Sequence, residues 1–529
     1  MDWTKGWREN TWKNLNQNWD VIVIGGGITG AGILRQCVHA GLKVLLLERR
    51  DFASGTSSRS SKLVHGGMRY LKNAQVRVTL ESVTEREYLL KQGLGLINRL
   101  GFLYPCLESD HMPGWVFGAG LMIYDLMAQQ WSHRSYDIED MRILCPLLTT
   151  DGLQGGYRFF DAQTDDARLV LRLIREAVQS GAYAINYAYV TALLKMNNGQ
   201  VCGVVARDCS GVTDKEVEIR ARVVINAAGS WADQLRGFIG RESRLRPLRG
   251  SHLVFQANRI PLTRAVTFSH PADGRPVFII PWEGAVIYGT TDVDQGKELP
   301  DDPRISEAET DYLLAGLQAV FPAQELSRKD VISSFSGIRP VVDTGKSNPS
   351  KESREHVLWD EDGLLTVSGG KLTTFRIMAR DALKAVRRHL GYIPFDPDIP
   401  VLDPLPLDAE SILEASHLPA TQCLRMLARY GSKASTYLCS GTKEEMEYIP
   451  GTPYLWGELR QAAREECVVH LDDLLLRRIR LGLLLPGGGM QPKDLIRKFL
   501  EKDLGWDNAR WDMEFQGYQD LWNSSYSPV

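Results

Sequence analysis

Three glycines near the start of the chain stand at a spacing that suits dinucleotide binding. Gly25, Gly27 and Gly30 follow residues 21–24, an apolar run too short for a helix, and form the pattern GxGxxG. The first glycine permits a tight turn, the second lets the backbone approach a pyrophosphate, and the third allows a helix to pack closely on the strand. The phosphates would then meet backbone amides and the positive end of the helix dipole.

A carboxylate ends the next apolar run. Residues 44–47 predict a second strand, and Glu48 at its tip can accept hydrogen bonds from ribose hydroxyls. An acidic residue at this position disfavours binding of a dinucleotide whose ribose carries a 2′-phosphate. A glycine-rich turn can also connect a strand to a helix without binding anything, but the two strands and the acid together favour a dinucleotide.

The polar stretch 49–71 follows directly. It is too rich in serine and glycine for a core element, and its side chains could wrap an extended polar ligand. Composition alone predicts a solvated serine-rich loop equally well. The position after Glu48 favours the ligand, and FAD suits the loop better than NAD because a flavin dinucleotide stays bound along its length. The candidate residues are Thr56, Ser57, Ser58, Ser60, Ser61, Lys62, His65, Gly66, Gly67 and Arg69.

The composition is that of a globular chain of two or three domains. Of the 529 residues, 43% are hydrophobic, and the formal net charge of -3 argues against a dedicated nucleic-acid binder. The eight cysteines form no CxxC pair and no metal-ligand spacing, so we expect reduced thiols, a cytoplasmic location and no metal. Residues 1–18 lack the apolar segment of a secretory signal, and the longest apolar run, 115–124, is too short to span a bilayer.

Sequence periodicity predicts the elements that would position these residues. A strand at 223–225 ends at the small residues 226–229, where the backbone could approach the cofactor again or form a plain turn. A helical pattern over 161–178, followed by a strand pattern over 182–194, predicts a second layer of the same, discontinuous nucleotide domain. An antiparallel sheet that forms a substrate wall is predicted from strands at 253–255, 277–281 and 286–289, with turns at 273–274 and 283–284.

The chain changes character near residue 394. Residues 393–406 form a proline-spaced linker, and the rest of the chain is predicted to be a separate all-helical domain. The clearest helical patterns cover 410–430 and 457–485.

Two groups of side chains fit either contact with a membrane or an ordinary structural role. The basic run Arg477, Arg478 and Arg480 fits a contact with acidic lipid or a partner, or equally a helix with one solvated basic face. The tryptophans near the N-terminus either anchor to lipid headgroups or pack against the body of the protein; they are Trp3, Trp7 and Trp12.

Seven motifs in one order resemble the FAD-dependent glycerol-3-phosphate dehydrogenases of the aerobic type. They are IGGGITGAGI, GTSSRSSKLVHGGMRYL, INAAGSWAD, RGSHLVF, FIIPWEGAVIYGTTDVD, SGIRPVV and SGGKLTTFRIMARDA. The resemblance covers residues 20–382 and continues more weakly through RYGSKA and DDLLLRRIRLG. Ser230 stands where the family usually has proline, and Arg249 replaces the commoner lysine; both departures are mild, although Ser230 leaves its turn less rigid.

The resemblance implies an α/β fold, α+β overall, with a Rossmann-like FAD-binding domain, an inserted antiparallel-sheet substrate domain and a C-terminal all-α domain. The implied ranges are 1–19 for an N-terminal extension, 20–90, 161–250 and 336–392 for the FAD-binding domain, 91–160 and 251–335 for the substrate domain, 393–406 for the linker, and 407–529 for the helical domain.

The implied reaction is oxidation of sn-glycerol 3-phosphate to dihydroxyacetone phosphate, with hydride transfer from C2 to flavin N5 and electrons passed on to quinone. The family also implies peripheral attachment to the inner face of the cell membrane, and a homodimer is possible. The alternatives are a glycerol-3-phosphate oxidase that uses oxygen, a related amine or 2-hydroxy-acid oxidase, and a flavin-binding regulatory protein without turnover.

Three residues are expected to carry the chemistry. The ordinary pKa of histidine lies close to working pH, so His252 suits a general base that takes the proton of the C2 hydroxyl. Lys371, at a glycine turn that opens a helix, can face both the flavin and the substrate oxygen. Because Arg339 can also stabilise the alkoxide, the base stays open between His252 and an arginine-assisted route.

The remaining candidates bind. A phosphate ester needs fixed positive charge, which bidentate guanidinium groups supply better than lysine; the expected substrate contacts are Arg69, Tyr70, Thr290, Arg339 and Arg354. The expected cofactor contacts are Gly25, Gly26, Gly27, Thr29, Gly30, Glu48, Thr56, Ser57, Ser60, Lys62, Leu63, His65, Gly66, Val190, Gly229, Lys371, Leu372 and Thr373.

Overall fold

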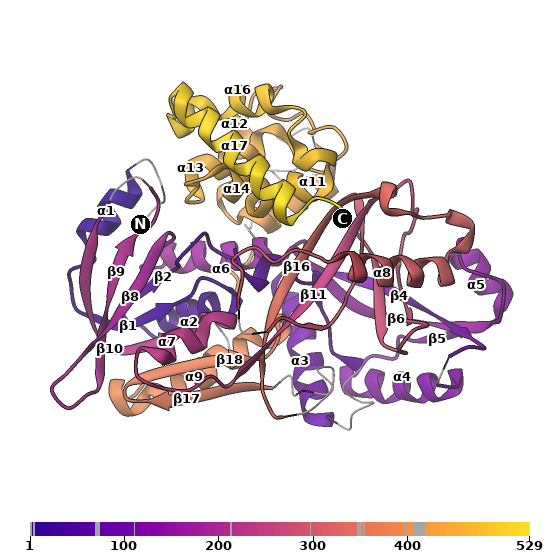
Figure 1. The fold of residues 1–529 in the computed structure, drawn as a ribbon, viewed down its shortest axis with the longest axis horizontal. Helices are drawn as coiled ribbons and strands as arrows, with labels where there is room; N and C mark the ends of the chain where they lie inside the picture. Colours follow the sequence, from indigo (N-terminus) through magenta and orange to yellow (C-terminus); the bar gives the residue numbers. More distant parts are fainter. Residues whose placement is uncertain are drawn as a thin grey trace.

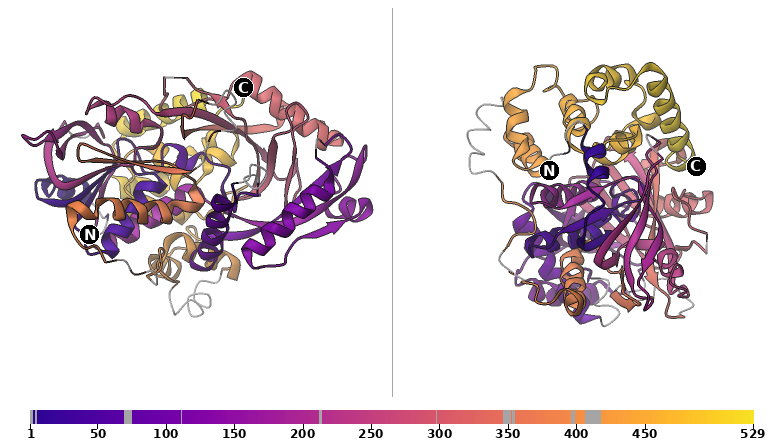
Figure 2. Two further views of the ribbon diagram at one scale, coloured as in Figure 1. Left: turned by 90° about the horizontal axis from the view of Figure 1, so that it is seen from below. Right: turned by 90° about the vertical axis from the view of Figure 1, so that its left-hand side faces the viewer.

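Two large sheets lie side by side, and a group of C-terminal helices covers one side of both (Figure 1). Figure 2 shows from two further directions that these helices stay on one side of the sheets. The computed structural model describes residues 3, 6–68, 75–110, 112–211, 214–296, 298–345, 352, 355–394, 396, 399–405 and 418–529.

The first sheet is built around the predicted βαβ unit. The helix α2 (Ile28–His39) connects β1 (Trp19–Ile24) to β2 (Val44–Leu47), and the two strands pair in parallel. The strand order is β17-β18-β10-β1-β2-β7, and the hairpin of β8 and β9 joins β10. The other strands are β7 (Tyr183–Ile185), β8 (Ala188–Lys195), β9 (Val201–Asp208), β10 (Glu216–Asn226), β17 (His356–Glu361) and β18 (Leu364–Gly369).

Both faces of the central strands are buried, as their continuous apolar runs require. The helices α2, α6 (Asp166–Gln179) and α9 (Phe375–Leu390) pack on one face in a common hydrophobic cluster. The hairpin of β8 and β9, with α1 (Trp7–Lys13), covers the other face. The short helix α7 (Ala232–Gly237) follows β10.

The second sheet has the order β15-β11-β14-β13-β12-β4-β6-β3, with β16 on β11 and β5 on β6. It is antiparallel except where β12 runs parallel to β4. Its strands are β3 (Leu63–Val64), β4 (Ile97–Leu107), β5 (Arg134–Tyr136), β6 (Leu153–Thr164), β11 (Leu245–Gln256), β12 (Ala265–Ser269), β13 (Pro276–Trp282), β14 (Ala285–Gly289), β15 (Val293–Asp294) and β16 (Val331–Val342). Its helices are α3 (Val76–Gln92), α4 (Gly114–Ala128), α5 (Ile138–Leu144) and α8 (Glu307–Val320).

The C-terminal helices share a hydrophobic cluster with the second sheet. Strand β16 binds these helices through two hydrogen bonds. The Ser333 hydroxyl donates to the Leu483 carbonyl, and the Ser334 amide donates to the Tyr526 carbonyl. The elements are α11 (Ala420–Tyr430), α12 (Lys433–Ser440), α13 (Trp456–Glu465), α14 (Leu471–Asp473), the π-helical turn η8 (Leu474–Arg478), α15 (Leu481–Leu484), α16 (Lys493–Leu504) and α17 (Asn508–Ser525). The predicted fold class, a Rossmann-like unit with a second sheet and C-terminal helices, is confirmed.

Two predicted elements differ from the structure. The helix predicted from residue 161 begins at Asp166, because residues 161–164 complete β6 and Asp165 caps the helix by accepting from the Arg168 amide. The pattern over 457–485 is several short helical segments rather than one helix. Short segments suit this place because η8 and α15 must follow the surface of the two sheets.

The interpretation of the basic run as a lipid contact or a solvated face is wrong. Arg477, Arg478 and Arg480 are each at most 2% exposed. Arg477 and Arg478 bind both oxygens of Asp51, which is equally buried in the polar stretch after β2. A pattern of charge along one helix shows nothing of carboxylates that arrive from more than 300 residues away.

The N-terminal tryptophans pack against the body. Trp3 is 6% exposed and stacks on Phe52 with ring centroids 5.6 Å apart, and Trp12 is 7% exposed. The Arg8 guanidinium fastens this segment by donating to the Asn186 carbonyl. Burial excludes headgroup anchoring through Trp3 and Trp12.

The pair of arginines on Asp51 gives a stability prediction. Changing Asp51→Ala leaves the buried Arg478 without a carboxylate and removes one of the three carboxylates that Arg477 binds, so we expect the free energy of unfolding to fall by about 3–5 kcal/mol. The exposed pair Arg77–Glu81 supplies the control, because Glu81→Ala should cost less than about 1 kcal/mol. Urea denaturation followed by tryptophan fluorescence measures both. Equal shifts of the two midpoints would contradict the buried pairing.

Candidate functional site

A cavity of about 880 Å³ lies between the two sheets. It extends from the carboxyl ends of β1 and β2 to the face of the second sheet formed by β4, β6, β11, β12, β13 and β16. This is the upper part of the size range of ligand pockets, roughly 300–1,000 Å³. The carboxyl end of a parallel sheet is also where open α/β folds bind ligands.

The glycine loop forms one end of the cavity. Gly25 has a positive φ of 112°, and a Cβ there would lie 2.5 Å from the Ala227 carbonyl oxygen. A Cβ on Gly30 would lie 1.8 Å from the Gly25 carbonyl oxygen, so only glycine permits this helix-to-strand contact. The start of α2 lines the cavity and carries no acidic residue in its first turn. The positive end of its dipole is therefore not offset by a side-chain charge and can face a phosphate.

Glu48 is held at the end of β2 by backbone amides. Gly26 donates to Oε2 at 2.6 Å and Arg50 donates to Oε1 at 2.8 Å. Burial raises the pKa of Glu48, while these two amides oppose the rise. Each carboxylate oxygen keeps a second lone pair, so the side chain can accept hydrogen bonds from ribose hydroxyls.

The polar stretch forms a fixed wall rather than a solvated loop. The Thr56 hydroxyl donates to the Ile338 carbonyl of β16, and the Ser57 hydroxyl accepts from the Ile28 amide at 2.9 Å. The Thr373 hydroxyl donates to the His65 carbonyl at 3.1 Å. The sequence candidates that line the cavity here are Thr29, Thr56, Ser57, Ser60, Leu63, His65, Val190, Gly229, Lys371, Leu372 and Thr373.

Four cofactor candidates do not contribute to the cavity wall: Gly26, Gly30, Lys62 and Gly66. The two loop glycines act through the backbone, as above. The Lys62 side chain is buried away from the cavity and binds Asp166. The Gly66 amide donates to Asp161 at 3.0 Å, and a Cβ on Gly66 would lie 2.2 Å from the Tyr124 hydroxyl oxygen.

The other end of the cavity holds a guanidinium group. Arg339 on β16 donates to the Thr290 hydroxyl at 3.0 Å and to Asp292 at 2.8 Å. A Cβ on Gly250, on the neighbouring strand β11, would lie 2.2 Å from an Arg339 terminal nitrogen. Glycine at this place therefore makes room for the guanidinium group at the cavity wall.

His252 lies two residues beyond Gly250, on the same face of β11, and lines the cavity. It is 2% exposed, and its Nε2 lies 2.8 Å from the Ser61 hydroxyl oxygen. Its Nδ1 is buried and has no hydrogen-bond partner among the described residues. Ser61 also lines the cavity, so the hydroxyl that contacts the imidazole is itself part of the cavity wall.

The pKa expected of His252 is wrong. Burial, and then the positive charges of Arg339 and Lys62, lower the pKa of His252 well below its usual range. The imidazole is therefore neutral at working pH and can accept a proton, but as a weak base. Sequence reasoning missed this because burial and the two cations come from three separate segments.

Lys371 completes this part of the wall. It stands directly before η7 (Leu372–Thr374), and its ammonium group donates to the Ser82 hydroxyl of α3 at 2.9 Å.

Arg69, Tyr70 and Arg354 lie outside the described residues. The structure adds Asp292, which binds Arg339, and shows that Ser61, a candidate of the polar stretch, contacts His252. The sequence gives no sign of either partner, because hydroxyl and carboxyl types alone do not reveal what they bind.

Comparison with known proteins places this geometry in a family. Residues 20–398 match the family model described as FAD dependent oxidoreductase, and residues 404–511 match the C-terminal domain of alpha-glycerophosphate oxidase. The aerobic glycerol-3-phosphate dehydrogenase of Bacillus subtilis (strain 168) is 32% identical over 97% of this chain and 96% of its own length. The chain belongs to the aerobic glycerol-3-phosphate dehydrogenase family of FAD-dependent oxidoreductases.

Other members agree. The aerobic glycerol-3-phosphate dehydrogenase of Staphylococcus aureus (strain USA300) is 37% identical over 72% of this chain and 70% of its own length. The crystal structure of the glycerol-3-phosphate dehydrogenase from Bacillus halodurans, complexed with FAD, superposes with a TM-score of 0.79 at 29% identity and covers 99% of this chain and 97% of that one. The prediction of FAD as the cofactor is confirmed, and we propose the glycine loop, the start of α2 and Glu48 as its contacts.

Glu48 gives a prediction for this flavoprotein. In Glu48→Gln one side-chain oxygen becomes an NH₂ group, which cannot accept from a ribose hydroxyl and faces a backbone amide. We expect the Kd for FAD to rise by about 10- to 100-fold, the effect of losing a charge-assisted hydrogen bond. Fluorescence titration of the apoprotein with FAD measures the change. The control is the exposed Glu501→Gln, and an unchanged Kd in Glu48→Gln would show that Glu48 does not hold the ribose.

Proposed function

We propose that this protein oxidises sn-glycerol 3-phosphate to dihydroxyacetone phosphate and passes the electrons on to quinone. The observation that carries the proposal is the placement of Arg339, Thr290 and His252 at one end of a cavity whose other end fits FAD. Bound FAD would supply the acceptor for hydride from C2 of the substrate. The relatives that share this architecture over nearly the whole chain carry the same activity in their names.

The phosphate is proposed to bind at Arg339 and Thr290. Asp292 holds the guanidinium group in place, and the hydroxyl of Thr290 stands beside it as a second donor. The Arg339 side chain keeps 26% exposure toward the cavity, so a phosphate oxygen can reach it. A planar guanidinium group suits a phosphate because it presents two parallel donors. By the resemblance, Arg69, Tyr70 and Arg354 join this site.

The proton of the C2 hydroxyl is proposed to leave through Ser61 to His252, or by a route assisted by Arg339. Ser61 is the member of the pair that reaches the cavity wall without being fully buried. A phosphate dianion in the site would offset the charge of Arg339 and raise the low pKa of His252. Lys371 adds a positive charge that stabilises the developing alkoxide.

The proposed electron acceptor is an apolar quinone. One part of the cavity wall is apolar and aromatic; it consists of Phe102, Tyr104, Met112, Val116, Phe117, Ile123, Phe159 and Phe278. Such a wall suits a flat ring system better than it suits a phosphorylated polyol.

Helix α4, which supplies three of these residues, also supports a site of membrane attachment. Its only charged residue, Asp125, is 3% exposed, whereas Trp115 and Leu126 are each 72% exposed and Met122 and Ile123 are each 50% exposed. An uncharged helix face with tryptophan near its end is typical of proteins that lie on a bilayer. We propose that α4 docks on the inner face of the cell membrane; a homodimer stays a prediction. Among the described residues, no helix has the length and apolar character to cross a bilayer.

The proposal is tested by anaerobic addition of sn-glycerol 3-phosphate to the FAD-loaded protein. We expect the absorbance band of oxidised flavin to bleach completely, because C2 oxidation delivers two electrons. Glycerol without phosphate is the control and should bleach the band far more slowly. A flavin-binding regulatory protein would leave the band unchanged.

Reoxidation separates the dehydrogenase from an oxidase. The match to the C-terminal domain of alpha-glycerophosphate oxidase makes oxygen the competing acceptor. The bleached protein is mixed with air-saturated buffer, with a soluble quinone, or with vesicles that contain a long-chain quinone. Fast recovery with oxygen alone would contradict quinone as the acceptor, and slow recovery with the vesicles would contradict docking through α4.

Arg339 gives a prediction about affinity. In Arg339→Lys the charge remains but the two parallel donors are lost, so we expect KM for glycerol 3-phosphate to rise by about tenfold or more and kcat to change less. Arg246→Lys is the control, because Arg246 lies on β11, outside the cavity wall, and pairs with Asp294. Steady-state kinetics measures both. A fall in kcat without a rise in KM would instead assign Arg339 to the alkoxide.

A further inference from the structure

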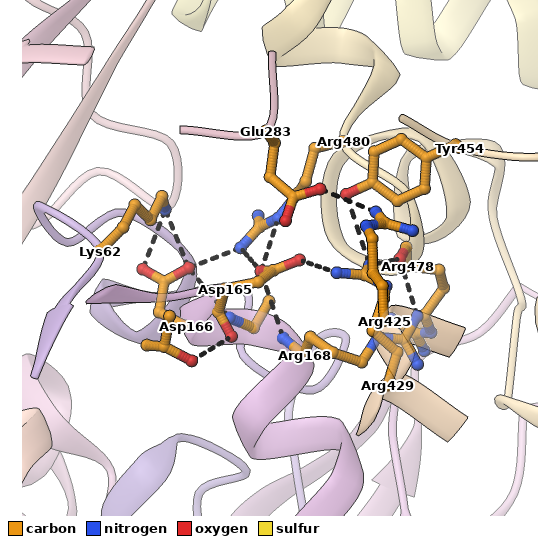
Figure 3. A network of polar contacts seen from close by, with 12 residues as sticks. Lys62, Asp165, Asp166, Arg168, Glu283, Arg425, Arg429, Tyr454, Arg478 and Arg480 are labelled. Atoms are coloured by element: carbon orange, nitrogen blue, oxygen red, sulfur yellow. Dashed lines mark hydrogen bonds and ion pairs between the residues drawn. The ribbon is translucent and has the colours of Figure 1, made fainter. Parts of the chain in front are cut away.

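A buried ion cluster lies directly behind the wall of the flavin cavity. The Lys62 ammonium group lies 2.9 Å from both oxygens of Asp166, and an Arg480 terminal nitrogen lies 2.5 Å from Asp166 Oδ1 (Figure 3). All three side chains are at most 1% exposed. The residues come from three distant segments: the polar loop after β2, the start of α6, and the C-terminal helices.

Asp166 ties this cluster to the loop. Its Oδ2 accepts from the Ser60 amide at 3.0 Å and from the Ser60 hydroxyl at 2.7 Å. The next residue, Ser61, contacts His252 Nε2 at 2.8 Å. Because these contacts fix two consecutive residues, the position of the Ser61 hydroxyl depends on the bond between Ser60 and Asp166.

Lys62 also approaches His252 from behind. Its ammonium group lies 4.8 Å from the centre of the Phe335 ring, and Phe335 stacks on the imidazole of His252 with ring centres 4.7 Å apart. The charged groups that bear on His252 are therefore Lys62 on this side and Arg339 from β16. Asp166 holds the first of these and Asp292 holds the second.

Arg480 has no contact with the cavity, yet it closes the cluster. Neither Arg480 nor Asp166 lines the cavity. A carboxylate as buried as Asp166 needs its full set of partners, since an unpaired buried charge is strongly unfavourable. Without Arg480, Asp166 would have to attract water or turn away from the loop.

We propose that Arg480 and Asp166 are positioning residues, through which the C-terminal helices fix the loop of Ser60, Ser61 and Lys62 against FAD and His252. The C-terminal domain is thereby part of the flavin site, although none of its described residues reaches the cavity wall. The effect on the loop does not depend on the substrate. Only the effect on His252 rests on the proposed function.

The ionisation of Lys62 supports this role. Burial lowers the pKa of Lys62 to about 8, with Arg480 acting in the same direction and Asp166 and Asp165 opposing it. The ammonium group is charged below that pH and loses its proton above it. The ion pair between Lys62 and Asp166, which helps to hold the loop, should therefore weaken between about pH 7 and 9.

The test compares two arginines that are equally buried in the same domain. Arg480→Met removes a partner that Asp165 and Asp166 share, whereas Arg429→Met removes a partner of Asp165, 3.1 Å away, that is not bonded to Asp166. The two variants therefore differ in the loss of the bond to Asp166. Hydrogen–deuterium exchange of peptides over residues 55–68 and the Kd for FAD are measured without substrate. We expect Arg480→Met to speed exchange and raise the Kd by about tenfold, and Arg429→Met to change neither, although both lower stability.

Three further variants test the proposal even if a methionine variant does not fold. If either methionine variant fails to fold, Arg480→Lys and Arg429→Lys are compared by the same two measurements. We expect the Kd for FAD of the unchanged protein to rise between pH 7 and 9, and Lys62→Met to abolish that rise. Equal effects of the two arginine substitutions on the loop, or the same pH dependence in Lys62→Met, would overturn the proposal and leave the cluster a structural contact only.

Discussion

The arrangement of this protein depends on the cost of burying charge. Asp51, Asp165 and Asp166 lie in or next to the walls of the flavin site, and each is at most 3% exposed. A buried carboxylate is tolerated only with cationic partners and further hydrogen bonds. The C-terminal helices supply those partners as Arg477, Arg478, Arg480 and Arg429, so the domain cannot separate from the two sheets without exposing unpaired ions.

Small residues provide the complementary constraint at the ligand. Gly25 and Gly30 bring the turn and the helix start onto the strand, and Gly250 gives space to the guanidinium group of Arg339. These glycines lie at opposite ends of one cavity and in different sheets. The ligand-facing wall is thus shaped by missing side chains, while the wall behind it is held by charged ones. The glycines and the buried ion pairs are both needed, because without the ion pairs the cavity wall would not keep its donors at hydrogen-bond distance from a ligand.

The local part of this design could be predicted from the sequence. The spacing of Gly25, Gly27 and Gly30 and the position of Glu48 are set within about 30 residues of chain, where strand and helix geometry decides which atoms meet. The same holds for the two-residue turn at 283–284 between β13 and β14. The resemblance supplied the motifs around His252 and Arg339, whose side chains the structure brings to one cavity.

The long-range part could not be predicted. A run of arginines looks alike whether it faces water or buried carboxylates, and nothing near Arg480 in the sequence indicates Asp166, 314 residues away. The shift of the His252 pKa has the same origin, since it needs the charges of Lys62 and Arg339 from two other segments. The sequence predicts helix at the end of β6 because residues 161–166 also fit a first helical turn. Pairing with β4 makes these residues strand as far as Thr164.

Charge compensation also shapes how the site would treat its ligand. Arg339 is already paired with Asp292, and Lys62 with Asp166, so these two groups bring little uncompensated positive charge to the site. Long-range electrostatic attraction therefore contributes less to the binding of an anionic ligand than hydrogen-bond donors that are already in position. A phosphate would find Arg339 and Thr290 pre-oriented, and its negative charge would raise the pKa of His252 only once it is bound. In the proposed reaction, phosphate binding and the base strength of His252 are thus linked through the charge of the Arg339 guanidinium group.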